Sequence, residues 1–112
     1  MPKSEYTKRP RCWYPLSKIK QCLEDGEVII RPNARLCAMI DFGWKTKEII
    51  RVISMLKPMH FYKSDYSNSL SSIVLDVYRG YFMGEDVYIH FYIDDYDKLI
   101  INSFKKDSIG NR

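Results

Sequence analysis

The sequence has few of the residues that metal sites, disulfide frameworks and nucleotide-binding loops require. It contains three cysteines without a C-x-x-C pair and two widely separated histidines, His60 and His90. This pattern argues against a secreted disulfide framework and gives no zinc spacing, so we expect a reducing, cytoplasmic location. The five glycines form neither of the phosphate-cradling loops G-x-x-x-x-G-K-S/T and G-x-G-x-x-G. We therefore expect neither a metal nor a cofactor.

Long apolar runs are also missing. No segment approaches the roughly 18 apolar residues that span a bilayer, so we expect no membrane association. The basic stretch from Met1 to Arg11 is not followed by an apolar segment, which argues against a signal peptide. The composition, 46% hydrophobic and 29% charged, is that of a globular chain. Residues 1–112 are predicted to form a single domain, long enough to bury roughly two-thirds of its unfolded surface.

Positive charge is concentrated near the N-terminus of a chain whose net charge is +4. Glu5 is the only acidic side chain in the first twenty residues, against six basic ones. Residues 1–14 are predicted to form a basic, loosely held arm, and residues 107–112 a frayed tail. The charge points only weakly to an anionic partner such as RNA. The nine tyrosines, five phenylalanines and two tryptophans could stack on unpaired bases or simply fill strands.

The N-terminal half of the chain is predicted to be mainly helical. Apolar residues recur at helical spacing over residues 16–23, and Gly26 supplies a stop. Residues 28–30 form an apolar run closed by a proline, which fits an edge strand or an extended connection. Residues 33–44 are ambiguous and could hold a short helix. A clearer helix is predicted over residues 46–56, with the threonine at its start as the N-cap.

Beyond residue 58 the hydrophobic period changes from helical to two, which predicts strands. The expected strands are residues 60–66, 72–80, 86–94 and 99–105. A turn is expected at residues 67–69, and the later connections are too short for helical crossovers, so the last three strands should form an antiparallel meander. This order of elements predicts an α+β fold. N-terminal helices should pack on a mainly antiparallel sheet formed by the C-terminal half.

The third predicted strand combines an apolar face with a polar, aromatic one. Alternation assigns to its core face Val87, Ile89, Phe91 and Ile93. Its other face then carries Tyr88, His90, Tyr92 and Asp94. Together with lysine and arginine side chains of the neighbouring strands, such a face could hold a phosphodiester and stabilise a pentavalent phosphorane. A solvated face without a function fits these residues equally well.

Three aspartates near the end of this strand, Asp94, Asp95 and Asp97, are close enough in sequence to suggest a metal site. They lack the glycine and the distal glutamate of a calcium loop, so a polar hairpin turn is predicted instead. No local pairing of a histidine with a cysteine or serine indicates a nucleophilic enzyme.

Four elements of the C-terminal half resemble the ordered motifs of the MqsR family. They are F-Y-K-S at residues 61–64, D-V-Y-R at residues 76–79, V-Y at residues 87–88 and S-F-K at residues 103–105. Their order and separations over residues 60–106 are similar to those of the family, while residues 12–58 share its architecture. Members of that family are messenger-RNA-cleaving toxins of bacterial toxin–antitoxin pairs with a RelE-like fold.

The resemblance implies a metal-independent endoribonuclease, an mRNA interferase, which cleaves single-stranded mRNA. In such enzymes the ribose 2′-hydroxyl attacks the adjacent phosphate and leaves a 2′,3′-cyclic phosphate and a 5′-hydroxyl. The resemblance also implies a cognate antitoxin that neutralises the toxin, and it leaves association with the ribosome open.

The resemblance also assigns roles to individual residues. Lys63 matches the family's functional lysine, which stabilises charge, and Tyr88 matches its functional tyrosine, which positions or protonates. Lys105 and Arg79 match further basic positions that contact phosphate. The family's active-site glutamine falls on Leu75, which leaves open a member that is weakened, inactive or differently built.

His90 is a candidate that the residues themselves suggest. Strand alternation puts it on the same face as Tyr88, and an imidazole with an ordinary pKa of roughly 6.5 can take and give a proton near neutrality. We expect His90 to act as general base or acid beside the catalytic lysines, and Tyr62 and Tyr92 to contact RNA together with Arg79. A surface histidine without a role is the alternative. A non-catalytic RNA- or ribosome-binding module and a protein-contact domain also stay open.

Overall fold

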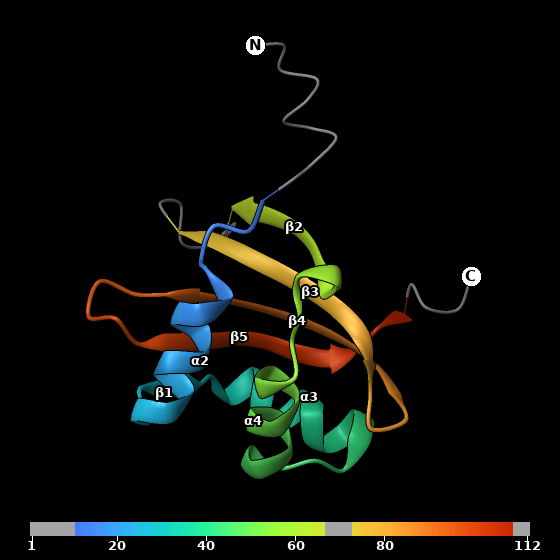
Figure 1. The fold of residues 1–112 in the computed structure, drawn as a ribbon. Helices are drawn as coiled ribbons and strands as arrows, with labels where there is room; N and C mark the ends of the chain where they lie inside the picture. The colour runs from blue at the N-terminus through green and yellow to red at the C-terminus, as the bar shows by residue number, and fades with distance from the viewer. Residues whose placement is uncertain (1–10, 67–72, 109–112) are drawn as a thin grey trace, which may run out of the picture.

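In a computed structural model the chain folds into helices packed against a sheet (Figure 1). The structure describes residues 11–66 and 73–108. In chain order the elements are α2 (Leu16–Asp25), β1 (Val28–Ile30), α3 (Pro32–Phe42), α4 (Thr46–Ser54), the 3-10 helix η1 (Pro58–His60), β2 (Phe61–Tyr66), β3 (Val74–Phe82), β4 (Glu85–Ile93) and β5 (Leu99–Lys106). Most of the expected arm, the turn expected at residues 67–69 and the tail beyond residue 108 lie outside the described residues. No helix among the described residues is long and apolar enough to cross a membrane.

The strands form one sheet in the order β1-β5-β4-β3-β2. The pairs β2–β3, β3–β4 and β4–β5 are antiparallel, which confirms the predicted meander. The limits of β3, β4 and β5 match the predicted ones to within two residues. Val28–Ile30 is an edge strand and not an extended connection, since it pairs in parallel with β5. The sheet therefore includes a strand from the N-terminal half in addition to the four that were predicted from the C-terminal half.

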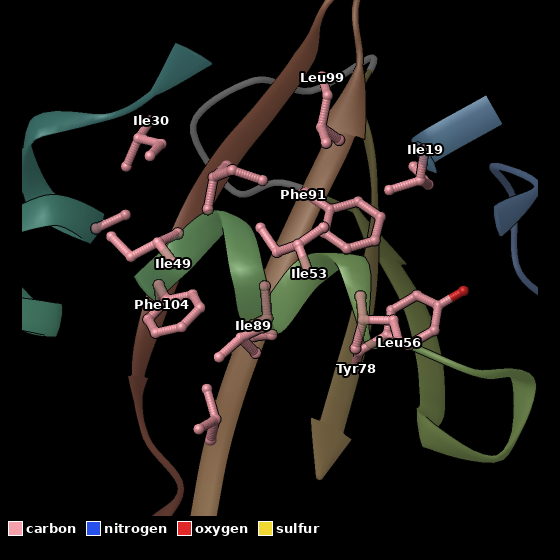
Figure 2. Close-up of a cluster of buried hydrophobic side chains, with 14 of the residues drawn as sticks. Ile19, Ile30, Ile49, Ile53, Leu56, Tyr78, Ile89, Phe91, Leu99 and Phe104 are labelled. Carbon is pink, nitrogen blue, oxygen red and sulfur yellow. The ribbon is translucent and has the colours of Figure 1, made fainter. Parts of the chain in front are cut away.

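The helices lie on one side of the sheet, which confirms the α+β arrangement (Figure 1). Val87, Ile89 and Phe91 of β4 point to this side, as the alternation predicts. Ile49 and Ile53 of α4 belong to the same core cluster and lie beside Ile89 and Phe91 (Figure 2). All five side chains are fully buried, and each contributes about 1.5–3 kcal/mol on burial. The described helices do not pack on the opposite face of the sheet.

The limits of α2 and α3 follow the predicted signals, whereas the N-cap of α4 does not. α2 and α3 end where Gly26 and Gly43 adopt a left-handed backbone with φ of 73°. The ambiguous segment after β1 is therefore a helix. α4 begins at Thr46, but its N-cap is Lys45, so the prediction of Thr46 as the N-cap is wrong. The Thr46 hydroxyl is instead turned toward α3, where it accepts a hydrogen bond from Arg35.

The segment between α4 and β2 also departs from the prediction. α4 stops at Ser54, although Leu56, the predicted end, still points into the core. Pro58 opens η1, because proline suits the first position of a helix and disfavours helical backbone in the residue before it. His60 therefore lies in η1 and not in β2, and its Nδ1 accepts a hydrogen bond from the backbone N–H of Lys57.

A buried carboxylate fastens the N-terminal segment to the sheet. Asp76 of β3 is fully buried and accepts hydrogen bonds from the backbone N–H groups of Trp13 and Tyr14, at 2.9 and 2.8 Å. The Ser64 hydroxyl of β2 donates a further bond, and the Tyr14 hydroxyl donates to the Val74 carbonyl. Burial, with the Asp76 charge, raises the pKa of Tyr14 to about 12, so its phenol keeps donating at neutral pH. The end of the expected loose arm is thus fixed in place.

We expect Asp76→Asn to lower the free energy of unfolding by about 2–3 kcal/mol, because the amide turns an NH₂ group toward donors that need an acceptor. Urea denaturation measures this loss. Asp86→Asn, at an exposed position of β4, is the matched control and should change stability by less than about 0.5 kcal/mol. Equal stability of the Asp76 variant and the wild type would show that this carboxylate does not hold the segment.

Candidate functional site

The face of the sheet turned away from the helices, here called the open face, carries most of the predicted site residues. Partners in register on neighbouring strands form rows across it. The first row is Lys63, Val77, His90 and Ser103. The second row is Arg79, Tyr88 and Lys105. The rows are two residues apart along each strand, a distance of about 7 Å. A single phosphodiester can therefore contact side chains of both rows.

Tyr62 and Lys63 reach the open face together because β2 is irregular. The register with β3 shifts between Phe61 and Lys63, which adds a residue to the strand. As a result, the Arg79 guanidinium lies 4.7 Å from the centre of the Tyr62 ring, and the Lys63 Nζ lies 5.7 Å from it. Strict alternation would have put these consecutive residues on opposite faces. The bulge therefore gives the site both a cation and an aromatic ring from one strand.

The aromatic residues of β4 sit beside a second cation. The Lys105 Nζ lies 5.2 Å from the centre of the Tyr88 ring, and that ring lies 5.7 Å from the His90 imidazole. Both Tyr88 and His90 are half-buried, as expected of side chains in the middle of a sheet. The four residues expected to be catalytic are thus brought to one surface, with Arg79 and Tyr62 beside them.

Lys63 has an exposed partner on its own strand. Its Nζ lies 3.1 Å from Asp65 Oδ2, and the two side chains are 48% and 59% exposed. The hydrogen bond and charge of Asp65 raise the pKa of Lys63, so the amine stays protonated at neutral pH. An exposed pair of this kind contributes little to stability, and a phosphate can replace the carboxylate at small cost. Asp65 was missed in the sequence, although its spacing of two from Lys63 is the signal that could have found it.

Arg79 has a buried partner from the C-terminal segment. Its Nε donates to Asp107 Oδ2 at 2.7 Å, and the side chains are 21% and 6% exposed. Asp107 raises the pKa of Arg79 and fixes the guanidinium in one orientation, while the group's other N–H donors can serve an anion. Asp107, the first residue of the expected frayed tail, is held by this ion pair. Nothing in the local sequence signals a partner so far along the chain.

Burial sets the proton chemistry of the central pair. Burial lowers the pKa of His90, the charge of Lys105 lowers it further, and Asp65 opposes both. The imidazole is therefore neutral at pH 7 and free to accept a proton. Burial raises the pKa of Tyr88, with Lys63 opposing, so the phenol is protonated and can donate. The two neighbours are suited to opposite halves of an acid–base reaction.

Leu75, at the position of the family's glutamine, belongs to an apolar cluster. It packs with Tyr92 and Ile100 on the open face, beside the first row. Tyr92 is only 8% exposed, so it does not present the open ring to RNA that the strand pattern suggested. The leucine packs on Tyr92 and Ile100 on one side, whereas Asp65 of β2 lies opposite it in register on the other.

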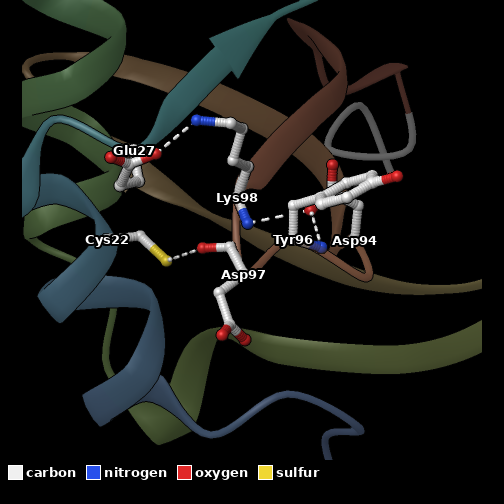
Figure 3. A network of polar contacts seen from close by, with 6 residues as sticks. All are labelled: Cys22, Glu27, Asp94, Tyr96, Asp97 and Lys98. Atoms are coloured by element: carbon white, nitrogen blue, oxygen red, sulfur yellow. Dashed lines mark hydrogen bonds and ion pairs between the residues drawn. The ribbon is translucent and has the colours of Figure 1, made fainter.

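The aspartates after β4 form the predicted polar turn. Asp94 Oδ1 accepts hydrogen bonds from the backbone N–H groups of Tyr96 and Lys98, each at 2.9 Å (Figure 3). The Cys22 thiol of α2 donates to the Asp97 carbonyl and ties the turn to the helix layer (Figure 3). Within residues 11–66 and 73–108, no three His, Cys, Asp or Glu side chains come together as a metal site would require.

An apolar groove lies away from the open face. It has a volume of about 690 Å³ and runs between the end of β1, α3 and the start of α4. Leu36, Met39 and Trp44 give it a mainly apolar lining, with Arg35 and Lys45 at its border. It contains none of the residues that the sequence suggested for a site.

Comparison with known proteins extends the resemblance seen in the sequence. The model of a protein family described as "Motility quorum-sensing regulator, toxin of MqsA" matches residues 11–106. The matched range includes the helices as well as the strands of the open face. A search of curated proteins found no match to the chain.

The two ion pairs of the open face should differ in strength. A double-mutant cycle of Arg79→Gln and Asp107→Asn should give a coupling energy of about 1–2 kcal/mol in urea denaturation, because the pair is largely buried. The same cycle for Lys63→Gln and Asp65→Asn should give at most about 0.5 kcal/mol, because water screens that pair. Equal coupling energies would contradict the distinction between a fixed Arg79 and an exchangeable Lys63.

Proposed function

The chain belongs to the MqsR toxin family, whose members are toxins of toxin–antitoxin pairs, and from this premise we propose that it is a metal-independent endoribonuclease that cleaves single-stranded mRNA. One observation carries the proposal. Three cationic side chains, Lys63, Arg79 and Lys105, surround a protonated phenol and a neutral imidazole on a single sheet face. This is the set of groups that phosphodiester transfer without a metal requires.

The cations bind the substrate phosphate. Lys63 and Lys105 stand in different rows on either side of Tyr88, so they can contact different oxygens of one phosphate. As the phosphate passes through a pentavalent phosphorane its negative charge grows, and preorganised cations stabilise that state more than the ground state. Arg79, held by Asp107, supplies a donor of fixed direction, while Tyr62 offers a flat ring beside it.

The protons move between the two central side chains and the RNA. His90 accepts the proton of the ribose 2′-hydroxyl while the 2′-oxygen forms its bond to phosphorus. The bond from phosphorus to the 5′-oxygen breaks, and Tyr88 gives that oxygen a proton. The products are a 2′,3′-cyclic phosphate and a 5′-hydroxyl, and proton exchange with water restores both side chains. The directions of their pKa shifts support this order of roles and not the reverse.

The proposal also names partners. The family implies an antitoxin partner, and we propose that this antitoxin neutralises the ribonuclease in the cytoplasm, where mRNA is available. Association with the ribosome is compatible with the same substrate and is not required by the chemistry of the open face.

A second candidate function rests on Leu75. The apolar cluster around Leu75 replaces a polar group of the family's site, which favours a module that binds RNA without cutting it. Such a module would bind single-stranded RNA with an affinity that falls steeply with salt, yet leave the RNA intact. Fragment formation on a long transcript distinguishes the two functions.

The ribonuclease is tested by Lys63→Ala, which should lower the cleavage rate by about 10²–10³-fold because the phosphorane loses a fixed charge. Lys18→Ala is the matched control. Lys18 is also an exposed lysine in an ion pair, 3.2 Å from Asp97, but it lies on α2 in the helix layer. It should cleave at the wild-type rate. Equal rates for the two variants would remove Lys63 from the site, and intact RNA with the wild-type protein would favour the binding module.

The role of His90 predicts a pH dependence. A base must be unprotonated, so the rate should fall as the pH drops through the lowered pKa of His90, below the ordinary value of about 6.5. His90→Gln should cleave about 10²-fold more slowly, and its rate should no longer show this fall at low pH, the acidic limb of the pH profile.

Lys105 gives a second readout of the same pKa. Lys105→Gln removes a positive charge that disfavours the imidazolium, so the limb should move to higher pH, while Lys105→Arg should keep it in place. An unchanged pH profile in both His90→Gln and Lys105→Gln would assign the proton transfer to another group.

A further inference from the structure

A small pocket lies at the end of the sheet where β3 begins and β4 ends. It has a volume of about 340 Å³, and its walls are both apolar and polar. The lining includes Trp13, Tyr14, Ile73, Tyr92, Asp94 and Asp95. Trp13 is 63% exposed although it is one of the largest apolar side chains of the chain. An exposed indole beside a hollow is a surface on which a flat ring can stack.

The pocket is held in a fixed shape. The backbone N–H groups of Trp13 and Tyr14 are bound to the buried Asp76, and the Tyr14 hydroxyl is bound to Val74. On the other side, Asp94 Oδ1 is occupied by two backbone N–H groups of the turn. Neither wall needs to rearrange for a ligand to enter, so little binding free energy is spent on ordering.

The pocket adjoins the candidate site. Tyr92 lines the pocket and lies two residues beyond His90 on the same face of β4. The two residues are therefore about 7 Å apart along the strand. Ile73 also lines it, and both residues pack against the cluster of Leu75 on the open face. A single strand of RNA whose phosphate lies between Lys63 and Lys105 can therefore extend one of its neighbouring nucleotides toward the pocket.

Charge separates the two ends of this surface. The candidate site presents Lys63, Arg79 and Lys105, which attract phosphate, whereas the pocket presents the carboxylates of Asp94 and Asp95. A phosphate would be repelled there, but an uncharged base would not. Carboxylate oxygens accept hydrogen bonds from exocyclic amino groups such as that of cytosine, and they gain less from uracil, which has none.

We infer that this pocket is a base-specific subsite, which stacks a nucleobase carrying an exocyclic amino group on Trp13 and reads that group with Asp95. The inference rests on the proposed function, since it places the base next to the scissile phosphate. It also gives Leu75 a role. The leucine supports Tyr92 in the pocket wall, so the apolar residue serves substrate selection at a position where the family has a polar one.

The test uses oligoribonucleotides with 2′-O-methyl groups, which the proposed reaction cannot cleave. An oligouridine is compared with versions in which cytosine, adenine or guanine replaces one uracil, and fluorescence anisotropy gives the Kd. The wild type should bind the amino-bearing versions about tenfold more tightly than oligouridine. Trp13→Ala should weaken their binding about tenfold, while Trp13→Phe should largely restore it. Asp95→Asn should reduce the preference over oligouridine.

Tyr96→Ala is the matched control, because Tyr96 is an 82% exposed aromatic residue of the neighbouring turn that does not line the pocket. It should bind every oligonucleotide as the wild type does. Circular dichroism checks that each variant folds. Equal binding by Trp13→Ala and Tyr96→Ala would overturn the subsite while leaving the ribonuclease standing. Lys63→Ala should weaken all the oligonucleotides equally, and a wild type that binds none of them would overturn both proposals.

Discussion

The helices pack against one face of the sheet, along Val87, Ile89 and Phe91 of β4, and within the described residues no helix lies on the other face of this strand (Figure 1). Because side chains alternate, the core residues fix where Tyr88 and His90 must point. A shift of one residue in the register of β4 would bury the imidazole in the core and expose three large apolar side chains. The hydrophobic core and the candidate site are therefore positioned by the same constraint.

The open face combines fixed and exchangeable charges. Arg79 is locked by the buried Asp107, whereas Lys63 is paired with the exposed Asp65, which a substrate can displace. Between them, burial keeps the imidazole of His90 neutral and the phenol of Tyr88 protonated. Both carboxylates lower the cost of holding several cations together, and an anionic substrate can take over the role of Asp65 alone. The positive side chains give way to the apolar cluster of Leu75, and the turn after β4 then carries negative side chains.

Much of this arrangement was predictable from sequence, for identifiable reasons. The period of two over residues 86–94 is a direct consequence of strand geometry, so it gave both faces of β4 correctly. The bulge that brings Tyr62 beside Lys63 was not predictable, because it depends on the pairing of β2 with β3. The Arg79–Asp107 pair joins residues far apart in sequence, and the local pattern of a polar C-terminus suggested fraying instead.

The N-terminal segment shows the same limit of local reasoning. A basic stretch next to a chain end resembles a mobile arm, yet the buried Asp76 of β3 binds the backbone of Trp13 and Tyr14. The burial of Tyr92 likewise follows from its neighbours Leu75 and Ile100 on adjacent strands, which the sequence of β4 alone does not contain. In each case the missing information was a contact between strands or segments. The order of the family motifs over residues 60–106 still identified several residues of the open face without that information.

The nature of the reaction products tests the ribonuclease most directly. A defined transcript is incubated with the protein in EDTA, the cut sites are mapped, and the fragment ends are identified by mass spectrometry. A second substrate carries a 2′-deoxy nucleotide at the mapped position. Attack by the 2′-hydroxyl predicts 2′,3′-cyclic phosphate and 5′-hydroxyl ends, full activity in EDTA and no cut at the 2′-deoxy position. Cleavage at the 2′-deoxy position, ends carrying a 5′-phosphate, or a requirement for a divalent ion would contradict the mechanism.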